Sequence, residues 1–196
     1  MTRTQLARLV IPAMVAALTA GLLGCSGTSD TVASGPTALG TLSAAESALS
    51  TAVPDAKLLL VQTASSVTPT GTPVWGYLFG SPSTDKTYLV YASDGKAMGA
   101  QEYATANLSE SEWAEVPDTY AWKIDSDDAY KKALEVSGAN GDPAAYMMGL
   151  MTYKSSADTS TVEPLVWNVW FDPGSSGATK NTIEVDANSG DARVVE

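Results

Sequence analysis

One pattern constrains this chain more than any other, because it occurs twice: a short amphipathic helix, a buried strand, a loop rich in serine and threonine, and a strand that opens with tryptophan. In each copy the aromatic and branched residues of that last strand alternate with other residues, at Trp75, Tyr77 and Phe79 and again at Trp167, Val169 and Phe171. A period of two places alternate side chains on one face of a sheet. The repeat predicts an α+β protein made of two similar units, each a helix packed on an antiparallel sheet.

The first unit is predicted to span residues 43–100. Ser43 and Glu46 have the spacing of a capping box, which predicts the start of the helix. Pro54 ends the helix, because the residue before a proline avoids helical angles. The buried strand follows at residues 57–61, and the turn around Gly95 leads into a last short strand.

The second unit is predicted to span residues 125–196. Asp125 or Ser126 caps its helix, and Gly138 lies where the helix ends. Residues 145–153 occupy the place of the buried strand, although a helix could also begin there because Pro143 suits a first helical turn. Residues 101–124 are predicted to be a packed connector, with a brief helix after Ser109.

The first 24 residues resemble an export signal, with Arg3 and Arg8 ahead of an apolar stretch of about fifteen residues, shorter than a membrane-spanning helix. The stretch ends in Leu-Leu-Gly before Cys25, which resembles the lipobox of bacterial lipoproteins and implies lipid attachment to Cys25. The alternative is an ordinary secretory signal with an unpaired cysteine. Residues 25–42 are predicted to be a flexible tether. Because the export signal and the lipid attachment would place the chain outside the cytoplasm, the expected location is the extracytoplasmic face of the cell membrane.

Composition excludes several kinds of function. The chain has no histidine, which removes the His-dependent catalytic triads and the usual zinc and iron ligands. Its net charge of −11 argues against partners such as nucleic acid or anionic lipid headgroups, which attract clusters of Lys and Arg. We therefore expect no cofactor, no metal and no nucleic acid, and no spacing of carboxylates singles out a catalytic pair.

The best candidate for a binding surface is Trp170, together with Leu78 at the matching position of the first copy. Both alternate with the predicted core residues and so fall on the opposite face of their strands. Two outcomes are open: these side chains form one surface for a partner, or they pack the two copies against each other. We favour internal packing, since a tandem pair must bury a mutual interface.

Three other clusters are better explained by structure than by function. Asp186, Asn188 and Asp191 could suggest calcium, but the spacing fails an EF-type loop and suits a turn. Acidic residues after Asp125 suit the first turn of a helix. The run that contains Met147, Met148 and Met151 is expected to fill the core.

The second half, with Trp167 leading a strand and Val-Asp-Ala-Asn-Ser-Gly-Asp at residues 185–191, resembles the PepSY domain; the first half resembles it less. The resemblance implies a helix across an antiparallel sheet and a role in holding proteases or other proteins inactive. The tandem arrangement is also similar to that of β-lactamase inhibitor proteins, whose two similar units grip an enzyme.

These observations predict a membrane-anchored, non-enzymatic lipoprotein that binds or restrains another exported protein. The alternative is a lipoprotein that holds a small molecule or a lipid between its two units, suggested by the aromatic and methionine content of both sheets.

Overall fold

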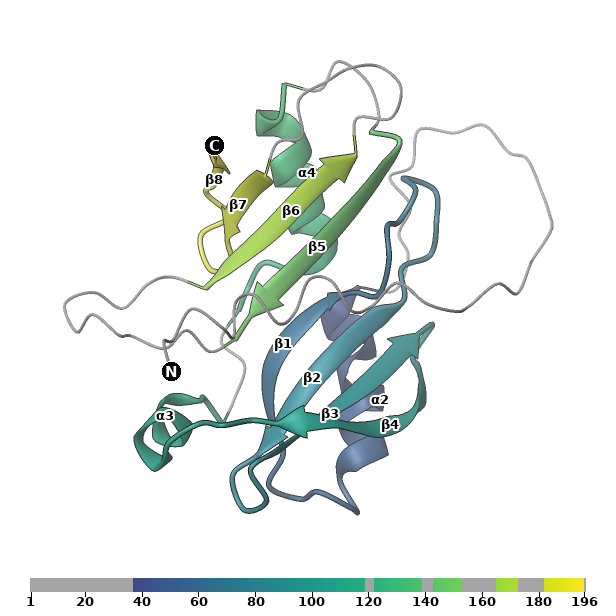
Figure 1. Cartoon of the computed structure of the whole chain (residues 1–196). Helices are drawn as coiled ribbons and strands as arrows, with labels where there is room; N and C mark the ends of the chain where they lie inside the picture. Colours follow the sequence, from purple (N-terminus) through teal and green to yellow (C-terminus); the bar gives the residue numbers. More distant parts are fainter. Residues whose placement is uncertain (1–36, 119–121, 139–142, 153–164, 173–181, 196) are drawn as a thin grey trace. The chain divides into compact units, whose positions relative to one another are not determined.

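The computed structural model describes residues 37–118, 122–138, 143–152, 165–172 and 182–195. The chain is α+β, as predicted, with an eight-stranded antiparallel sheet in the order β4-β3-β2-β1-β5-β6-β7-β8 (Figure 1). A helix followed by four strands occurs twice along the chain, with α3 between the two sets. The elements are α2 (Ala38–Leu49), β1 (Lys57–Thr63), β2 (Trp75–Ser81), β3 (Lys86–Ser93), β4 (Lys96–Thr105), α3 (Glu110–Glu115), α4 (Ser126–Val136), β5 (Ala145–Met151), β6 (Val166–Asp172), β7 (Thr182–Asp186) and β8 (Ala192–Val195).

Helices α2 and α4 pack on the same side of the sheet, α2 on β2 to β4 and α4 on β6 to β8. The predicted alternation along the tryptophan-led strands is confirmed: Trp75, Tyr77 and Phe79 in β2 and Trp167, Val169 and Phe171 in β6 are all buried beneath the helices. The side chains between them point to the other side, which faces the viewer in Figure 1 and is called the front face below. Leu78 and Trp170 lie on the front face.

The two sets of strands merge into one sheet, a question that the sequence left open. Strand β1 pairs with β5 at Leu60 to Gln62, and the side chain of Thr63 extends the contact, because its hydroxyl accepts from the amide of Met148 at 3.2 Å. One continuous core lies beneath this seam. The two predicted units are therefore two halves that share a sheet and a core.

Helix α2 begins earlier than predicted. Its N-cap is Thr37, whose hydroxyl accepts from Gly40 at 3.0 Å, so residues 38–42 are helical rather than part of a tether. Ala38 and Leu42 are buried in the core, and Glu46 lies within the helix instead of in its first turn. The predicted capping box was wrong because contacts made by the second half hold an earlier start in place.

Those contacts come from the first residues of α4. The Ser126 hydroxyl accepts from the Ala38 amide at 2.9 Å, and the Asp125 carboxylate accepts from the amides of Leu39 at 3.1 Å and of Ser126 at 2.7 Å. One carboxylate thus caps both helices. Both N-termini leave amides without partners inside their helices, and a negative charge is favourable beside them.

The remaining predictions have mixed outcomes. Residues 145–151 form a strand, as the repeat predicted, and Ser109 with Glu112 forms the predicted capping box at α3. Strand β4 is longer than predicted and takes in Gln101 to Thr105, which had been assigned to the connector. The predicted signal, Cys25 and most of the tether lie outside the described residues.

Candidate functional site

Trp170 is the exposed tryptophan of the chain and lies on the front face. The chain has five tryptophans, and four of them, Trp75, Trp113, Trp122 and Trp167, are at most 7% exposed, whereas Trp170 is 40% exposed. It lies in β6 directly opposite Met147 of β5 on one side and Thr182 of β7 on the other. The favoured prediction, that Trp170 packs the two halves together, is wrong, because the halves meet at β1 and β5 and in the core below.

Two exposed methionines lie on the front face of β5, with Met147 beside Trp170 and Met151 opposite Leu60 of β1. Met147 and Met151 are 40% and 44% exposed, while Met148 between them is 1% exposed and lies in the core. The prediction that this run fills the core therefore holds for Met148 alone. The period of two along β5 could have found the other two, since 147, 149 and 151 fall on one face when 148 and 150 fall on the other.

The position of the first half that matches Trp170 does not carry an exposed aromatic side chain. Leu78 is half-buried on the front face between Leu60 of β1 and Leu89 of β3, both of which are buried. It lies three strands from Trp170, and the register places it four residues from Trp170 along the strands, so the two are on the order of 20 Å apart. The structure therefore brings Leu78 and Trp170 to the same face without bringing them into contact.

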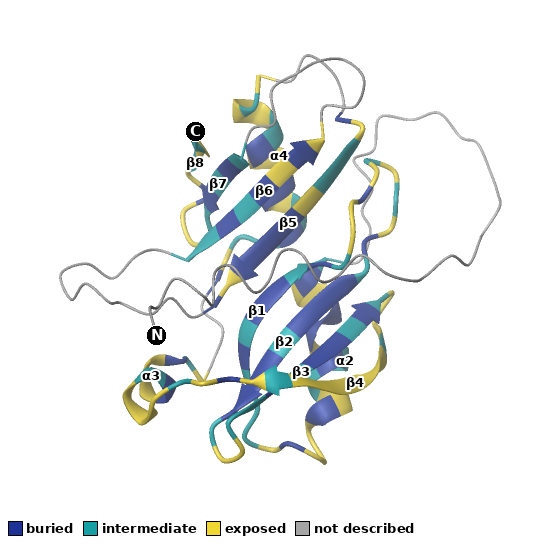
Figure 2. Cartoon of the chain, in the orientation of Figure 1, coloured by how far each residue is buried: buried dark blue, intermediate teal, exposed yellow. Residues whose placement is uncertain are grey.

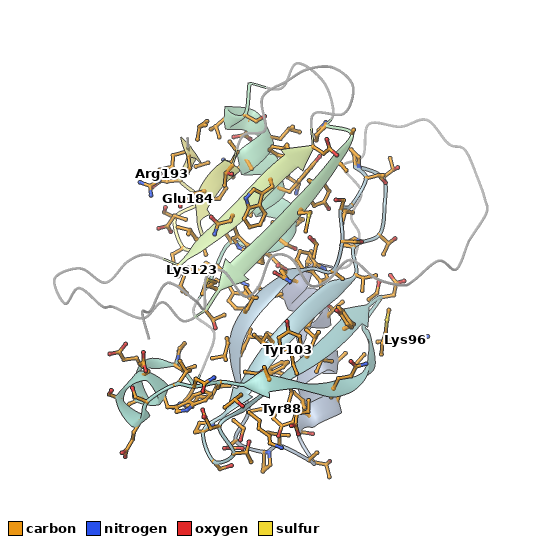
Figure 3. The ribbon with its side chains drawn as sticks, viewed as in Figure 1. Tyr88, Lys96, Tyr103, Lys123, Glu184 and Arg193 are labelled. Carbon is orange, nitrogen blue, oxygen red and sulfur yellow. The ribbon has the colours of Figure 1, made fainter. Side chains whose placement is uncertain are left out.

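Bulky side chains of the first half cover its own glycines. A Cβ built on Gly76 would lie 3.4 Å from the ring of Tyr91, and one built on Gly80 would lie 2.5 Å from the ring of Trp113. Trp113 belongs to α3, which therefore lies against the front face at this end. Tyr103 of β4 is 42% exposed and lies over the front face as well (Figure 3). The positions that match Gly76 and Gly80 are Asn168 and Asp172, so the two halves differ in how they fill this face.

Helix α3 is held by a lysine from β1. The Lys57 ammonium donates to the carbonyl of Val116 at 3.1 Å and forms an ion pair with Asp118 at 2.8 Å. Carbonyl groups at a helix C-terminus favour a cation, so Lys57 stabilises the end of α3. The helix is exposed elsewhere (Figure 2) and carries Glu110, Glu112 and Glu115.

The front face carries an ion pair near the β8 edge of the sheet. Glu184 of β7 and Arg193 of β8 lie together there (Figure 3), with the Arg193 Nε 2.9 Å from Glu184 Oε2. Arg193 and Lys57 are each paired with a carboxylate, and α3 adds the carboxylates of Glu110 and Glu115.

The acidic clusters considered from the sequence have structural roles. Asp186 accepts from the amides of Asn188 and Ser189, both at 2.8 Å, and these two hydrogen bonds hold the pKa of the Asp186 carboxyl below its usual value. Asp127 and Asp128 pair with Lys131. Within the part of the chain that the structure describes, no group of three or more acidic, cysteine or histidine side chains is placed to hold a metal ion.

The described helices are too short or too polar to cross a membrane. Cys25, the predicted point of lipid attachment, lies outside the described residues.

Comparisons with known proteins add information about the fold. No protein-family model matches the chain, and no curated protein sequence matches it. A crystal structure from Clostridium difficile, described as a "putative lipoprotein", is similar to this chain with a TM-score of 0.52 and 12% identity. The alignment covers 86% of this chain and 93% of that one, so the likeness extends over nearly the whole fold. At this identity it establishes a shared α+β architecture.

Proposed function

We propose that this chain is an exported lipoprotein, anchored through Cys25, that binds another exported protein through the front face of its sheet and catalyses no reaction. The observation that carries the proposal is the exposure of Trp170 beside Met147 on a sheet face opposite the two main helices. We also propose that the two halves are PepSY-like units in tandem. The repeated order of a helix and four strands supports this.

Exposed tryptophan and methionine are typical of surfaces that bind proteins. Tryptophan is enriched among the residues that contribute most binding energy, and methionine is enriched at interfaces and adapts its shape to a partner. Leaving Trp170 in water costs free energy that burial against a partner would recover. Tyr103 and the half-buried Leu78 extend the same face into the first half, so that a partner could contact both halves.

Charge narrows the kind of partner. Arg193 and Lys57 are already paired with carboxylates and the chain has a net charge of −11, so an epitope with lysine or arginine around an apolar centre would be complementary. The same charge opposes anionic lipid and nucleic acid. The resemblance to PepSY domains and to β-lactamase inhibitor proteins favours an exported enzyme as the partner, restrained by binding.

The name of the Clostridium difficile structure supports the lipoprotein part of the proposal. A short tether after Cys25 would hold the sheet close to the membrane, where exported enzymes and nascent exported chains are found.

The alternative function was a small molecule or lipid held between the two units. Beneath the seam of the sheet, the ring of Trp167 packs against those of Trp75 and Trp122, with a centroid distance of 6.2 Å in each pair. An apolar ligand would therefore lie on the front face beside Trp170 and Met147, where it would compete with a protein partner.

A site-specific photo-cross-linking experiment tests the proposal. The cross-linking amino acid p-benzoyl-phenylalanine is placed at position 170 of the full chain in its native host, and at position 135 as a matched control on the exposed side of α4. We expect one recurring protein adduct from position 170 that position 135 does not give. Equal adducts from both positions, or no adduct from position 170, would contradict the proposal, and a small molecule retained in native mass spectrometry would then favour the alternative.

A further inference from the structure

Met147 and Met151 are arranged so that an oxidant would reach them while the core stays protected. They are 40% and 44% exposed on the front face, with Gly149 between them, and Met148 in the same strand is 1% exposed. Met147 lies directly opposite Trp170. Met147 therefore borders Trp170, Met151 lies four residues farther along the same face opposite Leu60, and each thioether can be converted without opening the core.

Methionine oxidation changes polarity more than shape. A peroxide transfers one oxygen atom to the thioether sulfur: the O–O bond breaks, an S–O bond forms, the sulfur loses two electrons and the peroxide is reduced to water. The sulfoxide is polar, and such a change disrupts methionine-rich interfaces. Methionine sulfoxide reductases reverse the step, releasing the oxygen as water while two thiols become a disulfide.

We propose that Met147 and Met151 form a reversible oxidation site that switches the front face from apolar to polar when the chain meets peroxide. The consequence for partner binding rests on the proposed function, whereas the chemistry and the change in polarity do not. Histidine is missing from the chain and Cys25 is assigned to the lipid, so these thioethers are among the most oxidisable groups that its surface can offer.

The first measurement follows the oxidation of each methionine. Met98 in β4 is 58% exposed and would also react, so the full chain carries Met98→Leu as a background substitution. After graded exposure to hydrogen peroxide, peptide mass spectrometry reports each site. We expect Met147 and Met151 to oxidise on the order of tenfold faster than Met148, because susceptibility follows exposure. Equal rates at the three positions would overturn the proposal.

The second measurement follows the polarity of the folded surface. We expect peroxide to shorten retention on a hydrophobic-interaction column while the unfolding temperature stays unchanged. The variant Met147→Leu/Met151→Leu should keep its retention after peroxide, and Met147→Gln/Met151→Gln should elute early without it. Retention that does not change on oxidation, or that changes equally in the leucine variant, would overturn the proposal.

The two proposals fail separately. If position 170 gives no protein adduct in the unoxidised chain, the proposed function is contradicted, and the oxidation site is still judged by mass spectrometry and retention. If the adduct forms and persists unchanged after Met147 and Met151 are fully oxidised, the switch is contradicted and the proposed function stands.

Discussion

The ring of Trp75 meets the ring of Trp167 edge to face, with centroids 6.2 Å apart and an angle of 65° between the planes. The two residues open corresponding strands of the two halves, and both are buried. Trp167 also donates from its ring nitrogen to the carbonyl of Ile124 at 2.8 Å and contacts Trp122. This contact ties the two halves together beneath the seam of the sheet.

Replacing Trp167 should therefore destabilise the whole chain. We expect Trp167→Ala to lower the free energy of unfolding by about 3–5 kcal/mol, the usual effect of removing a buried tryptophan. Trp170→Ala, three residues along the same strand, should change it by about 0.5 kcal/mol or less, as is typical of surface sites. Urea unfolding followed by circular dichroism measures both. Similar losses in the two variants would contradict the assignment of opposite faces.

Because the Ser126 hydroxyl of α4 accepts from the first turn of α2, its removal should destabilise a helix far away in the sequence. We expect Ser126→Ala to destabilise the chain by about 1–3 kcal/mol, because the buried amide of Ala38 loses its acceptor. Ser47→Ala removes an exposed hydroxyl within α2 and should be close to neutral. Hydrogen exchange at the first turn of α2 checks the mechanism, since protection there should fall in Ser126→Ala and persist in Ser47→Ala.

The early start of α2 predicts where truncation becomes harmful. A chain that begins at Thr37 should unfold at about the same temperature as the full chain, because it keeps the cap and the buried first turn. A chain that begins at Ser43 loses the buried residues Ala38 and Leu42 and should lose several kcal/mol, at roughly 25 cal/mol for each Å² of apolar area exposed. Thermal unfolding of the two truncations distinguishes the observed boundary from the one predicted by sequence.

Trp113 above Gly80 predicts that a single methyl group will displace α3. In Gly80→Ala the new Cβ would lie 2.5 Å from the Trp113 ring and 2.8 Å from Leu59, so α3 must move. Gly76→Ala has its nearest neighbour at 3.4 Å and should be tolerated. We expect hydrogen exchange in residues 106–116 to increase in Gly80→Ala only. Unchanged protection would contradict this prediction, because it would show that the Trp113 ring can rotate away from the new methyl group while α3 stays in place.

The ionised carboxylate of Asp186 should add to the free energy of unfolding at neutral pH, and this contribution should be lost in acid. Its pKa is lowered in the fold by hydrogen bonds from the amides of Ser189 and Asn188, so it stabilises the fold fully above its usual pKa of 3.8. The contribution is lost as the pH falls through the lowered pKa. The turn is exposed, so the effect is small. The difference in unfolding midpoint between the natural chain and Asp186→Asn should narrow between pH 7 and pH 2; a constant difference would contradict this assignment.

The sequence predicts those parts of the fold that depend on local pattern. The alternation after Trp75 and Trp167 identifies the buried face, because burial on a sheet follows a period of two wherever one face meets a core. The capping box at Ser109 needs only residues three apart, and the repeat places β5 correctly although Pro143 also suits a helix.

Features that depend on distant residues were missed. The first turn of α2 contains Gly40 and Thr41, which are poor helix formers, and it is held by residues more than 80 positions away. The end of β4 has a polar sequence that predicts a connector, but it forms a strand because it pairs with β3. The alternation along the strand predicts that Trp170 lies on the face opposite the core. Whether another part of the chain covers that face depends on how the two halves join, and the local sequence pattern does not specify this.

The seam between β1 and β5 has a consequence for each half expressed alone. Separation would turn a central strand into an edge, and the bare amides and carbonyls of that edge would invite another chain. A single half would also expose the part of the shared core that the other half covers here. It should therefore self-associate in solution, through the bare edge and that apolar surface.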